Sequence, residues 1–157
     1  MAAVLADPVF LREAAEAQGG ANVEVDVQAT ADGFCVLVTR DVEVEVPALI
    51  RRLVRPMNRV AQKEVWRRNS QQWSSEFELH IGGLPTEVRG ATVLTQDASG
   101  GCHHQVSFEV RSKLPILARK LESFVADQVE QSIKAEFDCT AVAVQKAYPR
   151  SVPVELD

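Results

Sequence analysis

The sequence predicts an α+β protein in which a curved antiparallel sheet wraps around one long C-terminal helix. Three observations support this. Residues 23–111 contain several runs in which apolar and polar residues alternate, as in strands with one buried face. Turn-forming residues separate these runs at hairpin distances. Between Pro115 and Pro149 neither glycine nor proline occurs, which leaves room for a helix of about 45 Å.

The N-terminal segment is predicted to be helical. Asp7 and Pro8 form an N-cap followed by proline at the first helical position, a strong start signal. The helix is expected over 8–17, because two consecutive glycines follow it. Residues 2–6 are expected to form a short helical turn ahead of it.

A series of strands follows the helix. We expect a strand over 23–28, a turn at 31–33 and a long strand over 34–46. The even positions of the long strand face inward, and Arg40 is their single charged member. The connection 48–54 is predicted to be a short helix. The later strands are expected over 60–66 (facing unclear), 73–81, 86–96 and 102–111, with a hairpin loop at 97–101.

The long helix is predicted to open at Pro115. An apolar stripe runs along it, with Gln128 and Ser132 in its centre. The apolar sector is wide, so we expect contact with both the sheet and the N-terminal helix. Residues 1–146 are interpreted as one domain and residues 147–157 as a flexible tail.

Composition is that of a soluble globular protein. Of the 157 residues, 46% are hydrophobic and 25% are charged, and no apolar run reaches the ~18 residues of a membrane span. The net charge of −5 gives no general affinity for nucleic acid. Three widely spaced cysteines indicate reduced thiols and a cytoplasmic location. Residues 51–68 form a basic segment. Its positive charges either balance acidic residues elsewhere in the same fold or bind an acidic partner.

Four segments resemble a known superfamily. They are VLADPVFLREAAEAQGG (4–20), AQKEVW (61–66), GLPTEVRGATVLTQDASGG (83–101) and EVRSKLPILARKLESFVADQVEQSIKAEFDCT (109–140). This order is similar to the START-like superfamily (SRPBCC, the polyketide-cyclase/birch-pollen-allergen-like helix-grip fold), and more narrowly to a bacterial family of unknown function within it. The superfamily begins with a strand ahead of its first helix. We therefore expect either a helix-grip sheet without its usual first strand or a natural start upstream.

The resemblance implies a cavity between sheet and long helix for a hydrophobic or amphipathic small molecule, lipid-like or polyketide-like. Arg40 would hold an acidic or polar head group, with Gln128 and Ser132 as hydrogen-bond partners. The alternative is that the same side chains fill a solid core. The residues expected to line the cavity are Phe34, Val36, Val38, Arg40, Trp73, Phe77, Leu79, His104, Val106, Phe108, Leu121, Phe124, Val125, Gln128 and Ser132.

Two other functions stay open. The first is a protein-interaction module without internal ligand, which uses an edge strand or the basic segment 51–68. An unpaired sheet edge would be covered by the C-terminal tail, by a second copy in a homodimer, or by nothing. The second is a cyclase- or dehydratase-like enzyme, although no pair of convergent carboxylates is apparent and no catalytic residue is assigned.

No cofactor or metal is expected. Cys102 and His104 lie two apart on a strand and face the same way, so they could share a metal ion. A closed zinc site needs two further ligands, and only His80 offers one more apart from the neighbouring His103.

Overall fold

The computed structural model describes residues 1–70, 72–96, 98 and 101–149. The helices are α1 (Ala2–Leu5), α2 (Pro8–Ala17) and α3 (Ala118–Ala147). The strands are β1 (Ala21–Ala29), β2 (Gly33–Glu43), β3 (Met57–Arg68), β4 (Gln72–Ile81), β5 (Thr86–Gln96) and β6 (Cys102–Ser112). The predicted α+β class is confirmed. Most of the predicted loop 97–101, and the predicted tail from residue 150 on, lie outside the described residues.

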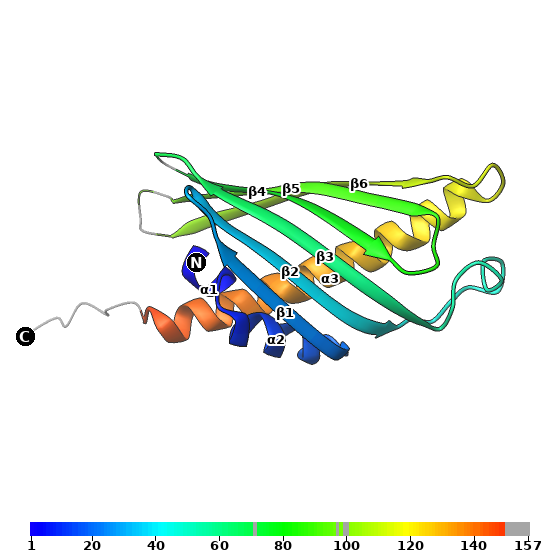
Figure 1. Cartoon of the computed structure of the whole chain (residues 1–157), viewed down its shortest axis with the longest axis horizontal. Coiled ribbons are helices and arrows are strands. Elements are labelled where there is room, and N and C mark those ends of the chain that lie inside the picture. Colours follow the sequence, from blue (N-terminus) through cyan, green and yellow to red (C-terminus); the bar gives the residue numbers. More distant parts are fainter. Residues whose placement is uncertain (71, 97, 99–100, 150–157) are drawn as a thin grey trace, which may run out of the picture.

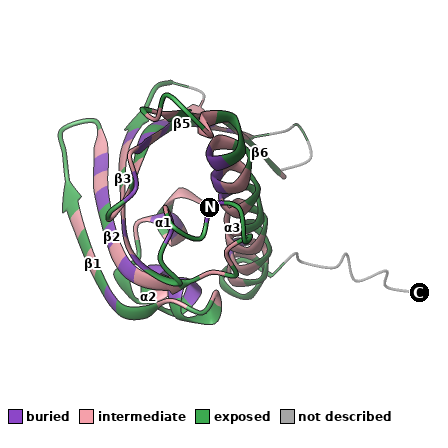
Figure 2. Cartoon of the chain, turned by 90° about the vertical axis from the view of Figure 1, so that its right-hand side faces the viewer, coloured by how far each residue is buried: buried purple, intermediate pink, exposed green. Residues whose placement is uncertain are grey.

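Within these residues the strands form one antiparallel sheet in the order β1-β2-β3-β4-β5-β6. The sheet curves, and α3 runs along its concave side (Figures 1 and 2). Helices α1 and α2 lie near the C-terminal part of α3, at one end of this arrangement (Figure 1). A long helix held by a curved antiparallel sheet is consistent with the helix-grip fold.

The predicted N-terminal helix is confirmed with its cap. The Val9 amide donates to the Asp7 carboxylate at 2.9 Å, which satisfies one of the free N–H groups of the first turn. Leu11, Ala14 and Ala15 are the buried residues of α2. Their spacing of three and four residues fixes the face that packs on the sheet.

The strand predicted over 34–46 is shorter than expected. Its even positions from 34 to 40 are buried, as predicted, but β2 ends at Glu43. Glu43 pairs with Met57, and beyond this pair the Val44 amide donates to the carbonyl of Pro56. Proline has no N–H to return, so the ladder stops there.

The connection 48–54 forms hydrogen-bonded turns, so the predicted short helix is wrong. Ile50 donates to the carbonyl of Pro47, and both Leu53 and Val54 donate to the carbonyl of Ile50. Ile50 and Val54 are each only 2% exposed. Burial of these two side chains against the second core, and not a helical ladder, holds the segment in place.

The third strand is longer than predicted, and the structure settles its facing. Asn58, Val60 and Trp66 are buried, so the even positions of β3 face inward. Gln62 and Glu64 therefore lie on the inner face as well. These two polar residues explain why the alternation in the sequence gave no clear facing.

The described residues form two hydrophobic cores. The first joins α1, α2, β1 and β2 with Trp66 and Leu94. The second joins the turn 48–54, β4, β5, β6 and α3. Helix α3 begins at Ala118 rather than at Pro115, because Leu117 adopts a left-handed conformation (φ 67°) as its N-cap.

The two edges of the described sheet are β1 and β6. Arg12 of α2 donates to the carbonyl of Val23 in β1 at 2.7 Å. Next to α3, the amide of Ser112 at the end of β6 donates to the carboxylate of Glu122 at 2.7 Å. At each edge, therefore, a side chain from a helix forms a hydrogen bond with one backbone group of the edge strand.

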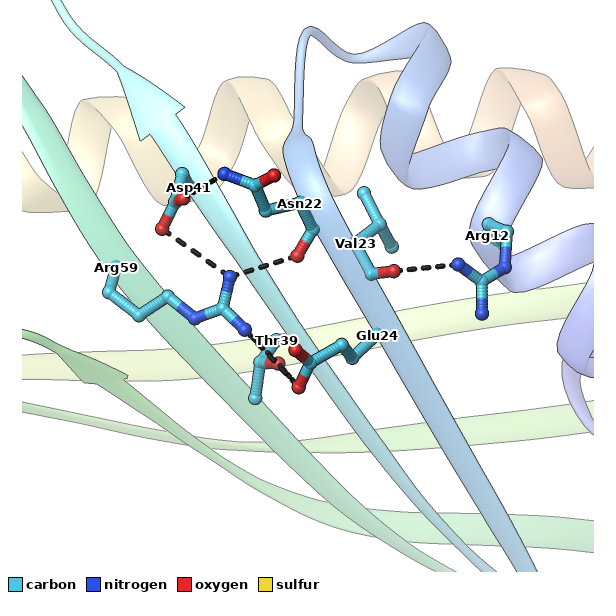
Figure 3. A network of polar contacts seen from close by, with 7 residues as sticks. All are labelled: Arg12, Asn22, Val23, Glu24, Thr39, Asp41 and Arg59. Atoms are coloured by element: carbon cyan, nitrogen blue, oxygen red, sulfur yellow. Dashed lines mark hydrogen bonds and ion pairs between the residues drawn. The ribbon is translucent and has the colours of Figure 1, made fainter.

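The outer face of β1–β3 carries a polar network centred on Arg59 (Figure 3). Its guanidinium donates to the carbonyl of Asn22 at 2.9 Å and to Thr39 Oγ1 at 2.8 Å, and it approaches Asp41 and Glu24 within 3.4 Å. Asn22 lies at a bulge with φ 49° and donates to Asp41. These contacts tie three strands together on the side away from α3.

No helix in the described part of the chain is both long and apolar enough to cross a membrane.

Candidate functional site

A cavity of about 150 Å³ lies between the concave face of the sheet and α3. The inner faces of β2 to β6 and one face of α3 form its walls, and Leu5 of α1, Val54 and Leu84 complete them. Most of the lining is apolar. An apolar cavity of this volume is large enough for a molecule the size of benzene.

Nine of the fifteen residues predicted for a ligand site line this cavity. They are Arg40, Phe77, Leu79, His104, Val106, Phe124, Val125, Gln128 and Ser132. They come from β2, β4, β6 and α3, elements that are distant in the sequence but that the curvature of the sheet brings together. The inward alternation of the strands and the stripe on the helix were sufficient to find them.

Six other predicted residues pack within the cores. Phe34, Val36 and Val38 belong to the first core, where Trp73 packs against them and Phe34 stacks on Trp66 at 5.9 Å. Leu121 and Phe108 belong to the second core. Helices α1 and α2 cover the first half of the inner face of β2, so its apolar residues there meet helix side chains.

A polar cluster of Arg40, Gln62, Glu64, Ser132 and Glu136 forms one part of the cavity wall. Arg40 is 8% exposed, and its guanidinium donates to Ser132 Oγ at 3.3 Å. Both oxygens of the Glu64 carboxyl group are engaged by side chains on the same face of β3. Gln62 Nε2 donates to one at 2.6 Å, and Trp66 Nε1 donates to the other at 2.7 Å.

The two carboxyl groups of this cluster, those of Glu64 and Glu136, interact electrostatically. Burial raises the pKa of Glu136 from 4.5 to about 7, and the negative charge of Glu64 adds to this effect. The positive charge of Arg40 and a hydrogen bond from Gln62 oppose the increase in pKa. Burial also raises the pKa of Glu64, against the hydrogen bonds from Gln62 and Trp66 and the charge of Arg40. Glu136 therefore gains or loses a proton close to neutral pH.

Arg40 is surrounded differently from the sequence-based expectation. Its pKa is lowered by burial, while the charges of Glu136 and Glu64 act in the opposite direction. An arginine keeps its charge throughout the physiological range. The guanidinium therefore already has two carboxyl groups nearby, before any ligand is present.

A hydrogen-bonded chain connects the cluster to the N-terminal helix. Ser132 Oγ accepts from Arg40 and donates to Gln18 Oε1 at 2.9 Å. Gln18 Nε2 in turn donates to the carbonyl of Ala14 in α2 at 3.2 Å. This chain links β2, α3 and α2, so the side chains of Arg40 and Ser132 are positioned by three elements.

His104 contributes a further polar group to the cavity. Its Nδ1 atom is buried and has no hydrogen-bond partner among the described residues, and burial lowers its pKa below 6.5. Its ring lies 5.9 Å from that of Phe137 on α3. Across the described residues, no group of three or more His, Cys, Asp or Glu side chains is placed to hold a metal ion.

Sequence reasoning missed Gln62, Glu64 and Glu136, and so it did not identify the two carboxyl groups that the fold brings together. Two signals were present. The irregular alternation in β3 came from Gln62 and Glu64 on its inner face. Glu136 lies four residues after Ser132, and positions four apart share one face of a helix.

The basic segment 51–68 divides between a loop and a strand. Arg51, Arg52 and Arg55 are exposed and border a second pocket, of about 330 Å³, beside Gly82 and Gly83. On β3, Arg59 and Arg67 form ion pairs with acidic residues of neighbouring strands, with Arg67 at 3.9 Å from Glu76. Arg68 lies over the Trp73 ring at 5.9 Å.

Comparison with protein families matches residues 1–143 to one family model, described as a protein of unknown function (DUF2505). None of the curated proteins compared with the chain matches it.

Proposed function

Since the chain belongs to this family of unknown function, we propose from the site itself that the protein binds a hydrophobic or amphipathic small molecule non-covalently. One observation carries the proposal: an apolar cavity of about 150 Å³ with a polar cluster at part of its wall. Ligand sites commonly combine apolar walls with a few polar groups that orient the ligand. The resemblance to START-like proteins supports the same function.

The volume limits the size of the ligand. A single ring or a short acyl chain matches about 150 Å³, whereas the pockets that bind drug-sized ligands measure roughly 300–1,000 Å³. Burial of the ligand's apolar part would stabilise the complex by about 25 cal/mol for each Å² removed from water. A lipid-like or polyketide-like ligand would therefore be small, or would enter only with its end.

Native mass spectrometry of the freshly purified protein, followed by solvent extraction, tests this proposal. A small molecule that is released on denaturation supports it and identifies the chemical class. A mass equal to that of the bare chain, together with dimers or protein adducts, would contradict it and favour an interaction module with a paired sheet edge.

A pair of variants links any bound molecule to the cavity. Val125 is 1% exposed and lines the cavity, so Val125→Phe should fill part of it and reduce the amount of bound ligand several-fold. Val142 lies on the same helix but is 52% exposed, so Val142→Phe serves as the control and should retain the ligand. Equal ligand content in both variants would place the ligand elsewhere.

The convergence of Glu64 and Glu136 favours a cyclase- or dehydratase-like enzyme as a second candidate. A carboxyl group with a pKa of about 7 can donate or accept a proton at neutral pH. Incubation of the extracted molecule with the protein, followed by mass spectrometry, distinguishes the two functions. Conversion to a product that Glu136→Gln abolishes would indicate an enzyme, whereas unchanged ligand would indicate binding alone.

The cytoplasmic location stays a proposal that rests on the three widely spaced cysteines, and cell fractionation tests it.

A further inference from the structure

The charges around the polar cluster indicate what kind of head group the cavity accepts. Arg40 supplies one positive charge, and Glu64 and Glu136 supply up to two negative charges. With both carboxyl groups ionised, the cluster carries one excess negative charge. Uncompensated charge in a buried site is costly, and a ligand of opposite charge removes that cost.

Charge balance argues against an acidic ligand at this position. A carboxylate head group would bring a third negative charge close to a single guanidinium. An ammonium head group would instead leave the site neutral, with two carboxylates and two cations. The lone pairs of the carboxylate oxygens provide acceptors for its N–H groups, because each oxygen can accept more than one hydrogen bond.

The hydrogen-bonding groups of the cluster agree with this. Gln62 Nε2 and Trp66 Nε1 already donate to Glu64, so these donors are engaged. Arg40 donates to Ser132 Oγ, whose own hydroxyl proton is directed to Gln18. The buried Nδ1 atom of His104 offers one more position on the cavity wall for a polar contact. Arg40 has further N–H groups besides the one that binds Ser132, so the cluster offers a ligand both donors and carboxylate acceptors, and its excess of negative charge is what favours an ammonium group.

We propose that the carboxyl groups of Glu64 and Glu136 bind an ammonium group, so that the preferred ligand of the cavity is a small apolar primary amine. The inference rests on the proposed function, because the amine occupies the same cavity. The apolar walls contact its hydrocarbon part, and the ammonium group lies beside the two carboxylates.

Binding of such an amine is coupled to the proton on Glu136. That proton and the ammonium group compete for the same negative charge, so the amine binds more tightly as pH rises. The charged or titratable groups that line the cavity around Glu136 are Arg40 of β2, Glu64 of β3 and His104 of β6. On the side of α2, the residues that border the cluster are Leu11, Ala14, Ala15 and Gln18, which carry no charge.

Burial lowers the pKa of His104 from its usual 6.5, so above this pH most of the imidazole is neutral. The change in amine affinity in this range therefore reports mainly on the carboxyl groups. Below the pKa of Glu136, which is about 7, the affinity should fall by up to about tenfold for each pH unit.

Isothermal titration calorimetry with three matched probes tests the proposal. Benzylamine, benzyl alcohol and benzoate share one ring and differ mainly in head group. At pH 8 we expect benzylamine to bind about tenfold or more tightly than benzyl alcohol, and benzoate to bind most weakly. Benzylamine should also weaken between pH 8 and pH 6.5, whereas benzyl alcohol should not.

Glu136→Gln keeps the shape of the side chain and removes its charge, so it should strongly reduce both the preference for the amine and its pH dependence, with Glu64 as the remaining carboxyl group. Glu130 lies exposed on the same helix, and Glu130→Gln is the matched control that should retain both. Circular dichroism verifies that each variant folds. If Glu136→Gln does not fold, the proposal is tested by the unmodified protein alone, through its relative affinities for the three probes and the pH dependence of benzylamine binding.

The outcomes separate this inference from the proposed function. Equal affinities for the three probes, or tightest binding of benzoate, would overturn the preference for an amine and leave ligand binding supported. An unchanged amine preference in folded Glu136→Gln would also overturn the inference. Absence of binding by all three probes would contradict the proposed function and the inference with it.

Discussion

Replacement of Glu136 by glutamine should stabilise the protein at neutral and alkaline pH and leave its stability nearly unchanged at pH 4.5. The pKa of Glu136 in the folded chain is about 7, and its unperturbed value is 4.5. Between these two values the folded state holds a proton that the unfolded state has released. The free energy of unfolding of the unmodified protein therefore falls as pH rises through this window.

The magnitude follows from the two pKa values. A difference between 4.5 and about 7, at about 1.4 kcal/mol for each pH unit, corresponds to about 3 kcal/mol. Glu136→Gln lacks the titrating group. Its free energy of unfolding, relative to that of the unmodified protein, should therefore rise by about 3 kcal/mol between pH 4.5 and 7.5.

Glu64 contributes to the same difference, because burial also raises its pKa and its negative charge repels that of Glu136. The difference therefore reports on this pair of carboxyl groups, and the other groups with shifted pKa values do not mimic it. The lowered pKa of His104 makes the folded state bind fewer protons than the unfolded state below 6.5, which gives the opposite slope. His104 is present in both proteins, so its contribution cancels in the difference. The lowered pKa values of Asp41 and Glu87 act below their usual 3.8 and 4.5, outside the window.

Urea unfolding at pH 4.5, 5.5, 6.5 and 7.5, followed by tryptophan fluorescence, measures the difference. Trp66 is 2% exposed in the first core and should report unfolding directly. Glu130→Gln, at an exposed position of the same helix, should show no pH-dependent difference. A difference that stays flat or falls with pH for Glu136→Gln would refute the raised pKa of this half-buried carboxyl group.

Two further predictions concern the frame that holds the site. Gly90→Ala should lower the free energy of unfolding by about 1–3 kcal/mol, because its Cβ would lie 2.3 Å from the Phe77 ring and 2.5 Å from the Ser107 carbonyl. An unchanged thermal midpoint would show that β4 and β5 are less tightly apposed than described. Asp7→Ala should cost about 1 kcal/mol by loss of the cap on α2, measured by urea unfolding. Asp127→Ala, on the exposed face of α3, is the control, and equal losses in both variants would argue against the cap.

The sequence contained most of the fold because alternation and helical periodicity are local signals. Three features were predicted from residues that lie at most four positions apart in the sequence. They are the cap at Asp7, the inward face of β2 and the apolar stripe of α3. The predictions were wrong where the local structure depends on residues that are distant in the sequence. The end of β2 depends on Pro56, the residue before the neighbouring strand β3. The turns at 48–54 depend on burial against the second core.

The candidate site was predictable in its apolar part and not in its polar part. A valine or phenylalanine on an inward face is recognisable from its neighbours in sequence. The role of Glu64 depends on Arg40 in the adjacent strand and on Glu136, which is 72 positions later in the chain. Only the curvature of the sheet around α3 brings these three charges together. From the sequence alone, Arg40 is expected to hold an acidic or polar head group, because neither carboxyl group can be placed beside it.

The polar cluster is difficult to explain as a device for stability. Replacement of buried ionic groups by apolar residues of similar size is often neutral or stabilising, so folding does not require such a cluster. Here it holds a carboxyl group that disfavours the folded state above its unperturbed pKa. The cluster lies on the wall of an otherwise apolar cavity. A cation that enters the cavity would offset the destabilisation caused by the ionised carboxyl group, which suggests that the cluster serves ligand binding. The stability measurement and the probe titrations therefore both examine the charge of Glu136. The first measures how much this charge destabilises the folded state, and the second measures how much it strengthens the binding of an amine.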